Sequence, residues 1–273
     1  MIGAAPSPLD LVELPFMRTA LAELALLAVA GGTLGAWIVL RRLAFFTHAA
    51  GTATFPGLVA ADASGVSPML AGLAVALGYA GGVERAQHAG RAPGDAATAL
   101  LLVAALATGV VLASDVLESG SAVDRLLFGT VLALTGSDLA LSATAAAFAV
   151  LSGLVLGRAW TALAFDPGAA PTLGIPSRAA ERLLLALVAA STVAAIPAVG
   201  ALLVASLFVV PAATARLLSG GVNGLVAWGI GLAVAEGVVG LYLSLWLDVP
   251  PGPAVATLGA GVFALVLAVK GSA

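Results

Sequence analysis

Cysteine is absent from the 273 residues, lysine occurs once, at Lys270, and charged residues make up only 9% of the chain. Without cysteine there is no disulfide, no thiolate nucleophile and no cysteine-based metal site. A soluble domain carries about 25% charged residues, so this chain has too little charge to cover a surface that faces water. The scarcity of basic residues also argues against a nucleic-acid surface, which needs clustered lysine and arginine.

Common catalytic motifs are absent as well. There is no G-x-x-x-x-G-K-[ST] loop to cradle ATP phosphates, and G-x-S-x-G, H-E-x-x-H and C-x-x-C are also missing. The two histidines, His48 and His88, stand 40 residues apart, which argues against a hydrolytic zinc site with several histidine ligands. We therefore expect a protein that is not an enzyme and holds no tightly bound cofactor. Any energy it uses comes from an ion gradient or from another subunit.

Hydrophobic residues are what the chain has in abundance: they make up 61% of it, and its mean hydropathy is +1.13. A helix needs about 20 apolar residues to cross roughly 30 Å of hydrocarbon, because backbone N–H and C=O groups must be paired where no water reaches. We predict an all-α, polytopic integral membrane protein with eight or nine transmembrane helices in a single domain, 1–273. The nine expected spans are 17–40, 45–62, 67–83, 96–113, 138–157, 183–197, 200–215, 224–247 and 253–269.

Three stretches depart from simple spans. The sixth and seventh spans are short and meet at 197–200, so they form either a hairpin or a pair of broken helices. The apolar piece 126–134 is too short to cross, and we expect a helix at, or dipping into, the outer interface. The longest polar gap, about 158–182, is expected to be a loop with one short helix punctuated by prolines. It is either a plain connector or a contact for a soluble partner.

The basic residues gather in alternate gaps between the spans. If the N-terminus lies outside, all 11 except Arg18 and Arg125 fall on the cytoplasmic side. Cytoplasmic loops of membrane proteins carry an excess of lysine and arginine. The charge pattern therefore predicts an external N-terminus and a cytoplasmic C-terminus.

Ionisable residues at membrane depth are costly and mark functional sites. Glu236 lies near the middle of the eighth span, where it is either a pathway residue or a hydrogen-bonded structural group. Glu23 is interpreted as an interfacial residue near the outer end of the first span. His48 and Thr52 are four residues apart in the second span and share one helix face. Imidazole suits zinc, copper and nickel, although a lone histidine can equally bond a neighbouring carbonyl.

Five blocks follow one another along nearly the whole chain: 37–46 leading to 55–57, 127–132 with 138–139, 164–167 with 174–176, 199–204 running to 210–216, and 248–253. Together they resemble the ABC-3 family, the membrane permeases of bacterial ABC importers for divalent metals such as zinc and manganese. The resemblance implies a homodimer or paired permease around a central pathway in the bacterial plasma (inner) membrane. It also implies a cytoplasmic ATP-binding subunit and an extracytoplasmic metal-binding protein as partners.

The third block is where the family contacts its ATPase. The resemblance therefore assigns coupling to the ATPase to Phe165, Asp166, Pro167 and Gly174. The resemblance therefore favours a coupling element over a plain connector for the loop 158–182. This agrees with the charge pattern, which places the loop on the cytoplasmic side.

The second span departs from the family pattern. The family carries a G-D-A-L-S-H-type stretch before its L-P-G, and the Asp and His are its metal pair. Aligned on Pro56 and Gly57, this chain has His48 at the Asp position and Thr52 at the His position. A hard ion such as manganese loses its best ligand, whereas a borderline ion can still use imidazole. We expect transport of zinc or another transition metal before manganese.

Two alternatives remain open. The permeases of iron–siderophore and cobalamin ABC importers have a comparable cytoplasmic loop and a similar apolar run that ends in proline. A secondary transporter driven by an ion gradient would show two inverted halves and paired carboxylates at mid-membrane. No internal repeat is evident, and Glu236 has no counterpart in the first half of the chain.

Overall fold

The computed structural model describes residues 14–89, 94–116, 129–130, 134–168, 170–201 and 203–271. The described residues form helices joined by short turns. The α-helices are α2 (Pro15–Leu40), α3 (Ala44–Thr52), α4 (Phe55–Ser64), α5 (Pro68–His88), α6 (Gly94–Val111), α8 (Gly136–Phe165), α9 (Ser177–Val199), α10 (Val204–Leu218), α11 (Val222–Leu247) and α12 (Pro251–Gly271). A π-helical turn, η1 (Leu112–Val116), follows α6, and a 3-10 turn, η3 (Ala170–Leu173), precedes α9.

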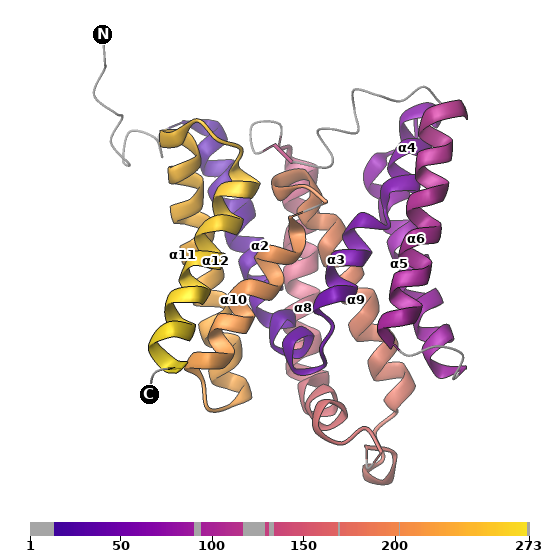
Figure 1. Cartoon of the computed structure of the whole chain (residues 1–273), viewed down its shortest axis with the longest axis vertical. Coiled ribbons are helices and arrows are strands. Elements are labelled where there is room, and N and C mark those ends of the chain that lie inside the picture. Colours follow the sequence, from indigo (N-terminus) through magenta and orange to yellow (C-terminus); the bar gives the residue numbers. More distant parts are fainter. Residues whose placement is uncertain are drawn as a thin grey trace.

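Long apolar helices dominate the described part of the chain. Six of them, α2, α6, α8, α9, α11 and α12, are long and apolar enough to cross a membrane, and α10 is a shorter apolar helix. Helices α3 and α4 together make one pass across the bundle, and α5 makes the next. With α10 and the six long helices, the described residues make nine passes. The first described helix, α2, accordingly begins at one end of the bundle, and the last, α12, finishes at the other (Figure 1). The predicted all-α polytopic architecture is confirmed.

The centre of the bundle differs from its periphery in burial. Buried residues make up 72% of the apolar window of α2 and 67% of that of α9, but only 17% in α6, α8 and α12. The central helices can approach closely because α2 carries glycines at its contacts. A Cβ atom added to Gly32 would lie 2.5 Å from the backbone nitrogen of Ile230 in α11. One added to Gly35 would lie 2.7 Å from the carbonyl oxygen of Phe208 in α10.

Helix α8 extends further than the sequence predicts. It continues to Phe165, and α9 begins at Ser177, so the connector between them is only 166–176 and contains η3. Trp160, inside the expected loop, is fully buried. Its ring meets that of Trp37 edge-on at 5.0 Å, and its Nε1 donates a hydrogen bond to the carbonyl oxygen of Ala180 at 2.7 Å. Tertiary packing thus keeps the chain helical beyond the apolar run.

The sixth and seventh spans are two separate helices joined by a short turn. The turn begins at Gly200, whose φ of 80° suits glycine because a side chain there would be strained. The backbone N–H of Thr130 donates to the carbonyl oxygen of Pro197 at 2.9 Å, next to this turn. Most of the interfacial helix expected at 126–134 lies outside the described residues.

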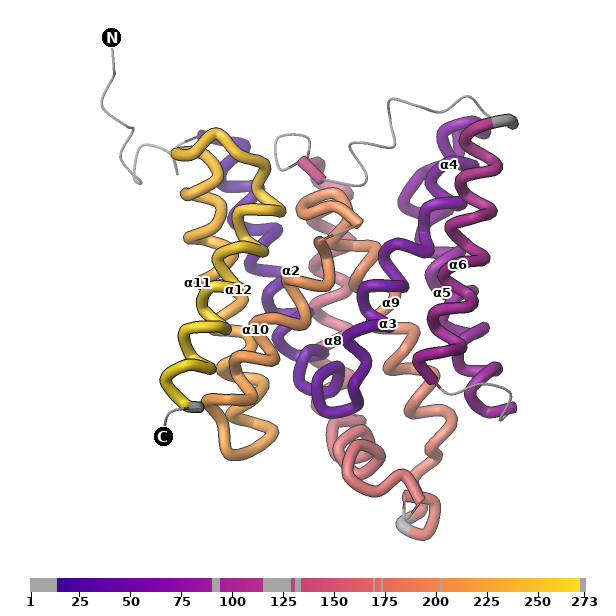
Figure 2. Tube along the Cα trace, viewed as in Figure 1, coloured from indigo at the N-terminus to yellow at the C-terminus, as the bar shows by residue number. Residues whose placement is uncertain are grey.

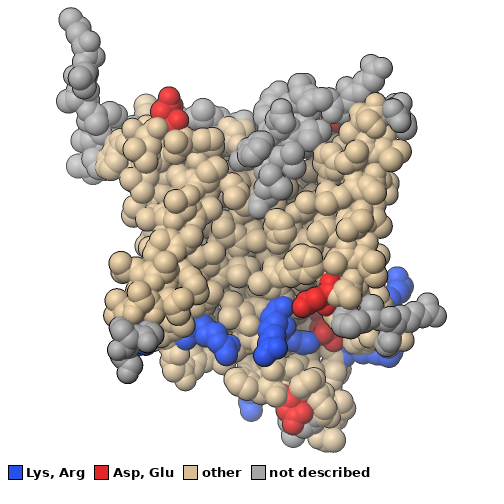
Figure 3. Space-filling model, in the orientation of Figure 1, with Lys and Arg blue, Asp and Glu red and all other residues tan. Residues whose placement is uncertain are grey.

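Charged side chains gather at one end of the bundle, called here the basic end (Figure 3). It is the end where α2 and α5 finish and α9 begins. The described basic residues of this end are Arg41, Arg42, Arg85, Arg158, Arg178, Arg182, Arg216 and Lys270. The large face above it in Figure 3 is almost free of charge, as a lipid-facing surface requires.

Candidate translocation pathway and coupling surface

The second pass is broken halfway. Helix α3 ends at Thr52 and α4 starts at Phe55, because Pro56 has no N–H to donate and is tolerated only in the first turn of a helix. Thr54 Oγ1 donates to the carbonyl oxygen of Gly51 at 2.6 Å, which satisfies one acceptor freed by the break. Irregular backbone at membrane depth is tolerated where it is buried in protein or lines a cavity, and such breaks form binding sites in transporters.

His48 and Thr52 both lie on α3, next to the break. His48 is half-buried and Thr52 is buried. Thr52 Oγ1 donates to the carbonyl oxygen of His48 at 3.0 Å, which uses the hydroxyl proton and leaves oxygen lone pairs for a ligand. Among the described residues, no group of three His, Cys, Asp or Glu side chains is placed to hold a metal ion. The pair therefore offers one imidazole and one hydroxyl, not a closed metal centre.

Helix α3 occupies a central position. It packs against α6, α9 and α10, and Figure 2 shows its trace between α10 on one side and α5 and α6 on the other. Phe46 of α3 stacks on Tyr79 of α5 with ring centroids 5.9 Å apart. The Tyr79 hydroxyl donates to the carbonyl oxygen of Thr98 in α6 at 2.7 Å. Neighbouring helices thus hold the helix that carries His48.

Glu236, the other pathway candidate, lies on α11 in a different place. Its side chain is buried, and its Oε1 has no hydrogen-bond partner among the described residues. The carboxylate faces α12, where a Cβ atom added to Gly259 would lie 2.8 Å from Glu236 Oε2. Helix α10 packs against both α3 and α11. Among the described residues, His48 and Glu236 belong to no common group of three potential metal ligands.

Glu23 is fully buried inside the bundle, which its interpretation as an interfacial residue near the outer end does not anticipate. Helices α8 and α9 pack against α2 and cover it. Ser142 of α8 donates from Oγ to Glu23 Oε1 at 2.5 Å, while Oε2 has no partner among the described residues. The sequence alone does not show which helices cover a carboxylate.

The four residues assigned to coupling lie together at the exposed connector. Phe165 ends α8 with 73% of its side chain exposed, and Pro167 is exposed next to it. Asp166 accepts a hydrogen bond from the N–H of Gly168 at 3.1 Å. Gly174 has a φ of 72°, which allows the tight turn before α9. The connector thus presents an aromatic ring and an acid beyond the helices.

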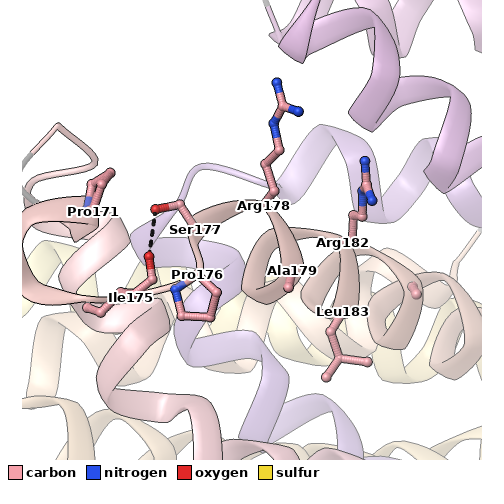
Figure 4. Close-up of a pocket in the computed structure, with 9 residues that line it drawn as sticks. Pro171, Ile175, Pro176, Ser177, Arg178, Ala179, Arg182 and Leu183 are labelled. Atoms are coloured by element: carbon pink, nitrogen blue, oxygen red, sulfur yellow. Dashed lines mark hydrogen bonds between the residues drawn. The ribbon is translucent and has the colours of Figure 1, made fainter.

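A groove of about 870 Å³ runs beside this connector. Its lining residues are Pro171, Ile175, Pro176, Ser177, Arg178, Ala179, Arg182, Leu183 and Ala186. Arg178 and Arg182 point together to one side of α9, whereas Leu183 points to the other (Figure 4). Apolar surface bordered by charge is the usual anatomy of a protein–protein contact.

An ionic cluster at the basic end was not identified from the sequence. It consists of Arg41 after α2, Glu84 and His88 on α5, and Glu181 and Arg182 on α9. Arg41 Nη2 lies 2.7 Å from Glu181 Oε1, and Arg182 Nε lies 2.8 Å from Glu84 Oε1. His88 Nε2 stands between the two carboxylates, 3.6 Å from Glu84 and 3.9 Å from Glu181. The i,i+4 spacing of Glu84 and His88 was the only local signal.

The backbone beside this cluster is strained. Arg42 follows Arg41 in the turn between α2 and α3 and has a φ of 57°. For a residue with a side chain, this left-handed conformation costs about 1–2 kcal/mol. Such a residue persists only where surrounding contacts hold it.

Comparison with known sequences gives consistent matches over the chain. The sequence pattern of the ABC 3 transport family matches residues 13–270. The chain is 30% identical over 262 residues to the manganese transport system membrane protein MntC of Halalkalibacterium halodurans, covering 94% of this chain and 88% of that protein. It is 24% identical over 256 residues to the manganese import system permease protein ScaB of Streptococcus parasanguinis, covering 94% and 91%.

The fold also matches a solved structure. Superposition on PsaBC from Streptococcus pneumoniae in complex with Fab gives a TM-score of 0.83 at 22% identity and covers 95% of this chain and 94% of that one. At this identity the likeness establishes the fold. The overall fold of this chain is therefore one that a solved protein adopts.

Proposed function

The chain belongs to the ABC 3 transport family, and from this premise we propose that it is the membrane permease of an ATP-driven importer for divalent metal ions. The family match over nearly the whole chain is the observation that carries this proposal. It agrees with a sequence that has many apolar spans and no ATPase motif of its own. Membership of an ABC family leaves the gradient-driven alternative without support.

His48 and Thr52 are the proposed ligands along the pathway. Each copy of the chain supplies one imidazole and one hydroxyl, so two copies around a central path supply two of each. Weak, incomplete coordination suits a conducting site, because an ion must bind well enough to enter and weakly enough to leave. This proposal needs no closed metal centre in a single chain.

The proposed cargo is zinc or another borderline ion before manganese. Two arguments conflict here. Relatives named for manganese transport favour manganese. The chemistry of the second span favours a borderline ion, because His48 and Thr52 provide no carboxylate and imidazole suits zinc better than manganese. We give priority to the ligands, since they contact the ion.

The connector 166–176 and the groove beside it are the proposed docking surface for the ATPase. The exposed ring of Phe165 and the apolar side chains of the groove supply buried contact area, and Arg178 supplies charge at its edge. This assignment places the basic end in the cytoplasm, as the distribution of lysine and arginine predicts. The opposite end then faces the extracytoplasmic metal-binding protein.

Reconstitution in proteoliposomes with the partner ATPase and binding protein tests the function. We expect accumulation of radiolabelled zinc that requires ATP and persists when ionophores abolish all ion gradients. Accumulation that follows a gradient and ignores ATP would restore the secondary-transporter alternative. Absence of zinc and manganese uptake, together with ATP-dependent uptake of a metal chelate, would favour the siderophore or cobalamin class.

Co-purification tests the docking surface separately. Phe165→Ala combined with Asp166→Ala should reduce recovery of the ATPase with the permease, because the change removes an exposed aromatic contact. Phe148→Ala is the matched control, since Phe148 is also an exposed ring, 63% against 73% for Phe165, on the same helix but far from the connector. Equal recovery of the ATPase with both variants would contradict the assignment.

A further inference from the structure

We propose that the ionic cluster is the link through which movement of the connector 166–176 reaches the helix that carries His48. This inference rests on the proposed function, in which the ATPase docks on the connector. It adds a role that neither the family match nor the docking surface assigns: the cluster residues position α3 and do not contact the ion.

One branch of the link runs through Arg41. Glu181 stands in the second turn of α9, directly after the connector, and holds Arg41 at 2.7 Å. Arg41 is in the turn that leads into α3, only seven residues before His48. The side chains of Arg41 and Glu181 are 14% and 18% exposed, so water and salt screen their attraction less than that of a surface pair. A displacement of the base of α9 therefore pulls on the start of α3.

A second branch reaches α3 through α5. Arg182 pairs with Glu84, which is 3% exposed, near the end of α5. The same helix stacks Tyr79 on Phe46 of α3. The two branches start at the neighbouring residues Glu181 and Arg182 of α9 and both lead to α3. His88 lies between the carboxylates of Glu84 and Glu181.

The strained turn before α3 is where this helix can move. Arg42 is one of two described non-glycine residues with positive φ, the other being Asp248. Strained positions cluster in segments that switch between two arrangements. Here the strain lies between Arg41, which Glu181 holds, and the first residue of α3, so a movement of Arg41 with α9 changes this turn and shifts α3.

A purely structural role for the cluster makes a different prediction. If the ion pairs only fasten α2, α5 and α9 together, breaking one lowers stability and reduces ATP hydrolysis and uptake to the same extent. If they transmit movement, breaking one separates ATP hydrolysis from uptake. The ratio of ions imported to ATP hydrolysed is therefore the decisive measurement.

The experiment uses the complete complex in proteoliposomes, with zinc as the transported probe. Glu181→Gln removes the charge while keeping the shape, and Glu84→Gln, on the other branch, is a second variant in case the first does not fold. Arg85→Gln is the matched control, because Arg85 is an exposed arginine of α5 with no ion pair among the described residues. The swap Arg41→Glu with Glu181→Arg tests whether the two residues act as a pair.

We expect Glu181→Gln to lower the number of zinc ions imported per ATP by about fivefold or more, with ATP hydrolysis close to that of the unmodified complex. The charge swap should recover most of that ratio, and Arg85→Gln should leave it unchanged. An unchanged ratio in Glu181→Gln and Glu84→Gln, or a swap that recovers nothing, would overturn the inference. Absence of uptake by the unmodified complex would instead refute the proposed function.

Discussion

The break in the second pass and the ionic cluster lie at opposite ends of the same nine-residue helix, α3, and they hold their polar groups in opposite ways. At the break, His48 has no acidic neighbour that completes a metal site among the described residues. In the cluster, two arginines are paired with two glutamates at 2.7 and 2.8 Å. An ion must leave its ligands quickly, whereas helices that move together must stay joined.

The difference teaches which kind of substitution each region tolerates. Loss of a ligand at the break removes a transient interaction and leaves the packing intact, so transport should fail without loss of assembly. Loss of one partner in a shielded ion pair leaves an uncompensated charge, which is destabilising. The predictions below use this contrast, beginning with the largest expected effect.

Replacing His48 should have the largest effect on transport. His48→Ala removes the only imidazole beside the break. We expect zinc uptake to fall by about two orders of magnitude, the upper end of the effect of changing residues that hold metal ligands in place. The complex should still assemble. His88→Ala is the control with the other histidine of the chain. Its Nε2 lies 3.6 Å from Glu84, so its loss should cost far less uptake. Normal uptake by His48→Ala would remove the residue from the pathway.

Adding a side chain at Gly32, where α2 contacts α11, should lower the stability of the bundle that holds both the break and the ionic cluster. Gly32→Ala brings a Cβ atom to within 2.5 Å of the Ile230 backbone nitrogen, and overpacking of this kind costs about 1–3 kcal/mol. Thermal unfolding in detergent measures the effect. Gly78→Ala is matched to it, since a Cβ atom on Gly78 meets no neighbouring atom within 4 Å. A lower melting temperature for Gly78→Ala than for Gly32→Ala would contradict the packing described here.

Restoring the family's metal pair should change the preference between ions. The double change His48→Asp with Thr52→His supplies a carboxylate and an imidazole, and hard ions prefer carboxylate oxygen. We expect the ratio of manganese to zinc uptake to rise about tenfold, equivalent to about 1.4 kcal/mol. Uptake of each ion in separate vesicles measures the ratio. A constant ratio would mean that these two positions do not select the ion.

The smallest effect is expected at Glu236. Glu236→Gln keeps the shape of a side chain that packs against Gly259, and we expect uptake within about twofold of the unmodified value, as for a substitution away from the reacting centre. Uptake kinetics at saturating zinc provide the measurement. A loss as large as that of His48→Ala would place the carboxylate on the pathway and would weaken the contrast between the regions.

Much of the fold could be predicted because span length and the distribution of arginine are local properties of the sequence. The exposed connector after Phe165 could likewise be located from a short motif, whereas the break before Pro56 is not predicted, because the second span is expected to run unbroken over 45–62. The ionic cluster could not, because Arg41 and Glu181 are 140 residues apart and Arg182 and Glu84 are 98 apart. The burial of Glu23 and the extension of α8 past Trp160 also depend on neighbours that only the folded chain supplies.

Competition between zinc and manganese tests the central claim most directly. ATP-dependent uptake of radiolabelled zinc is measured in vesicles with and without a large excess of unlabelled manganese. The measurement is made for the unmodified complex and for His48→Ala. The account predicts zinc uptake that resists manganese in the unmodified complex and is lost in the variant. Uptake that manganese suppresses in proportion to its excess, or that His48→Ala leaves intact, would contradict it.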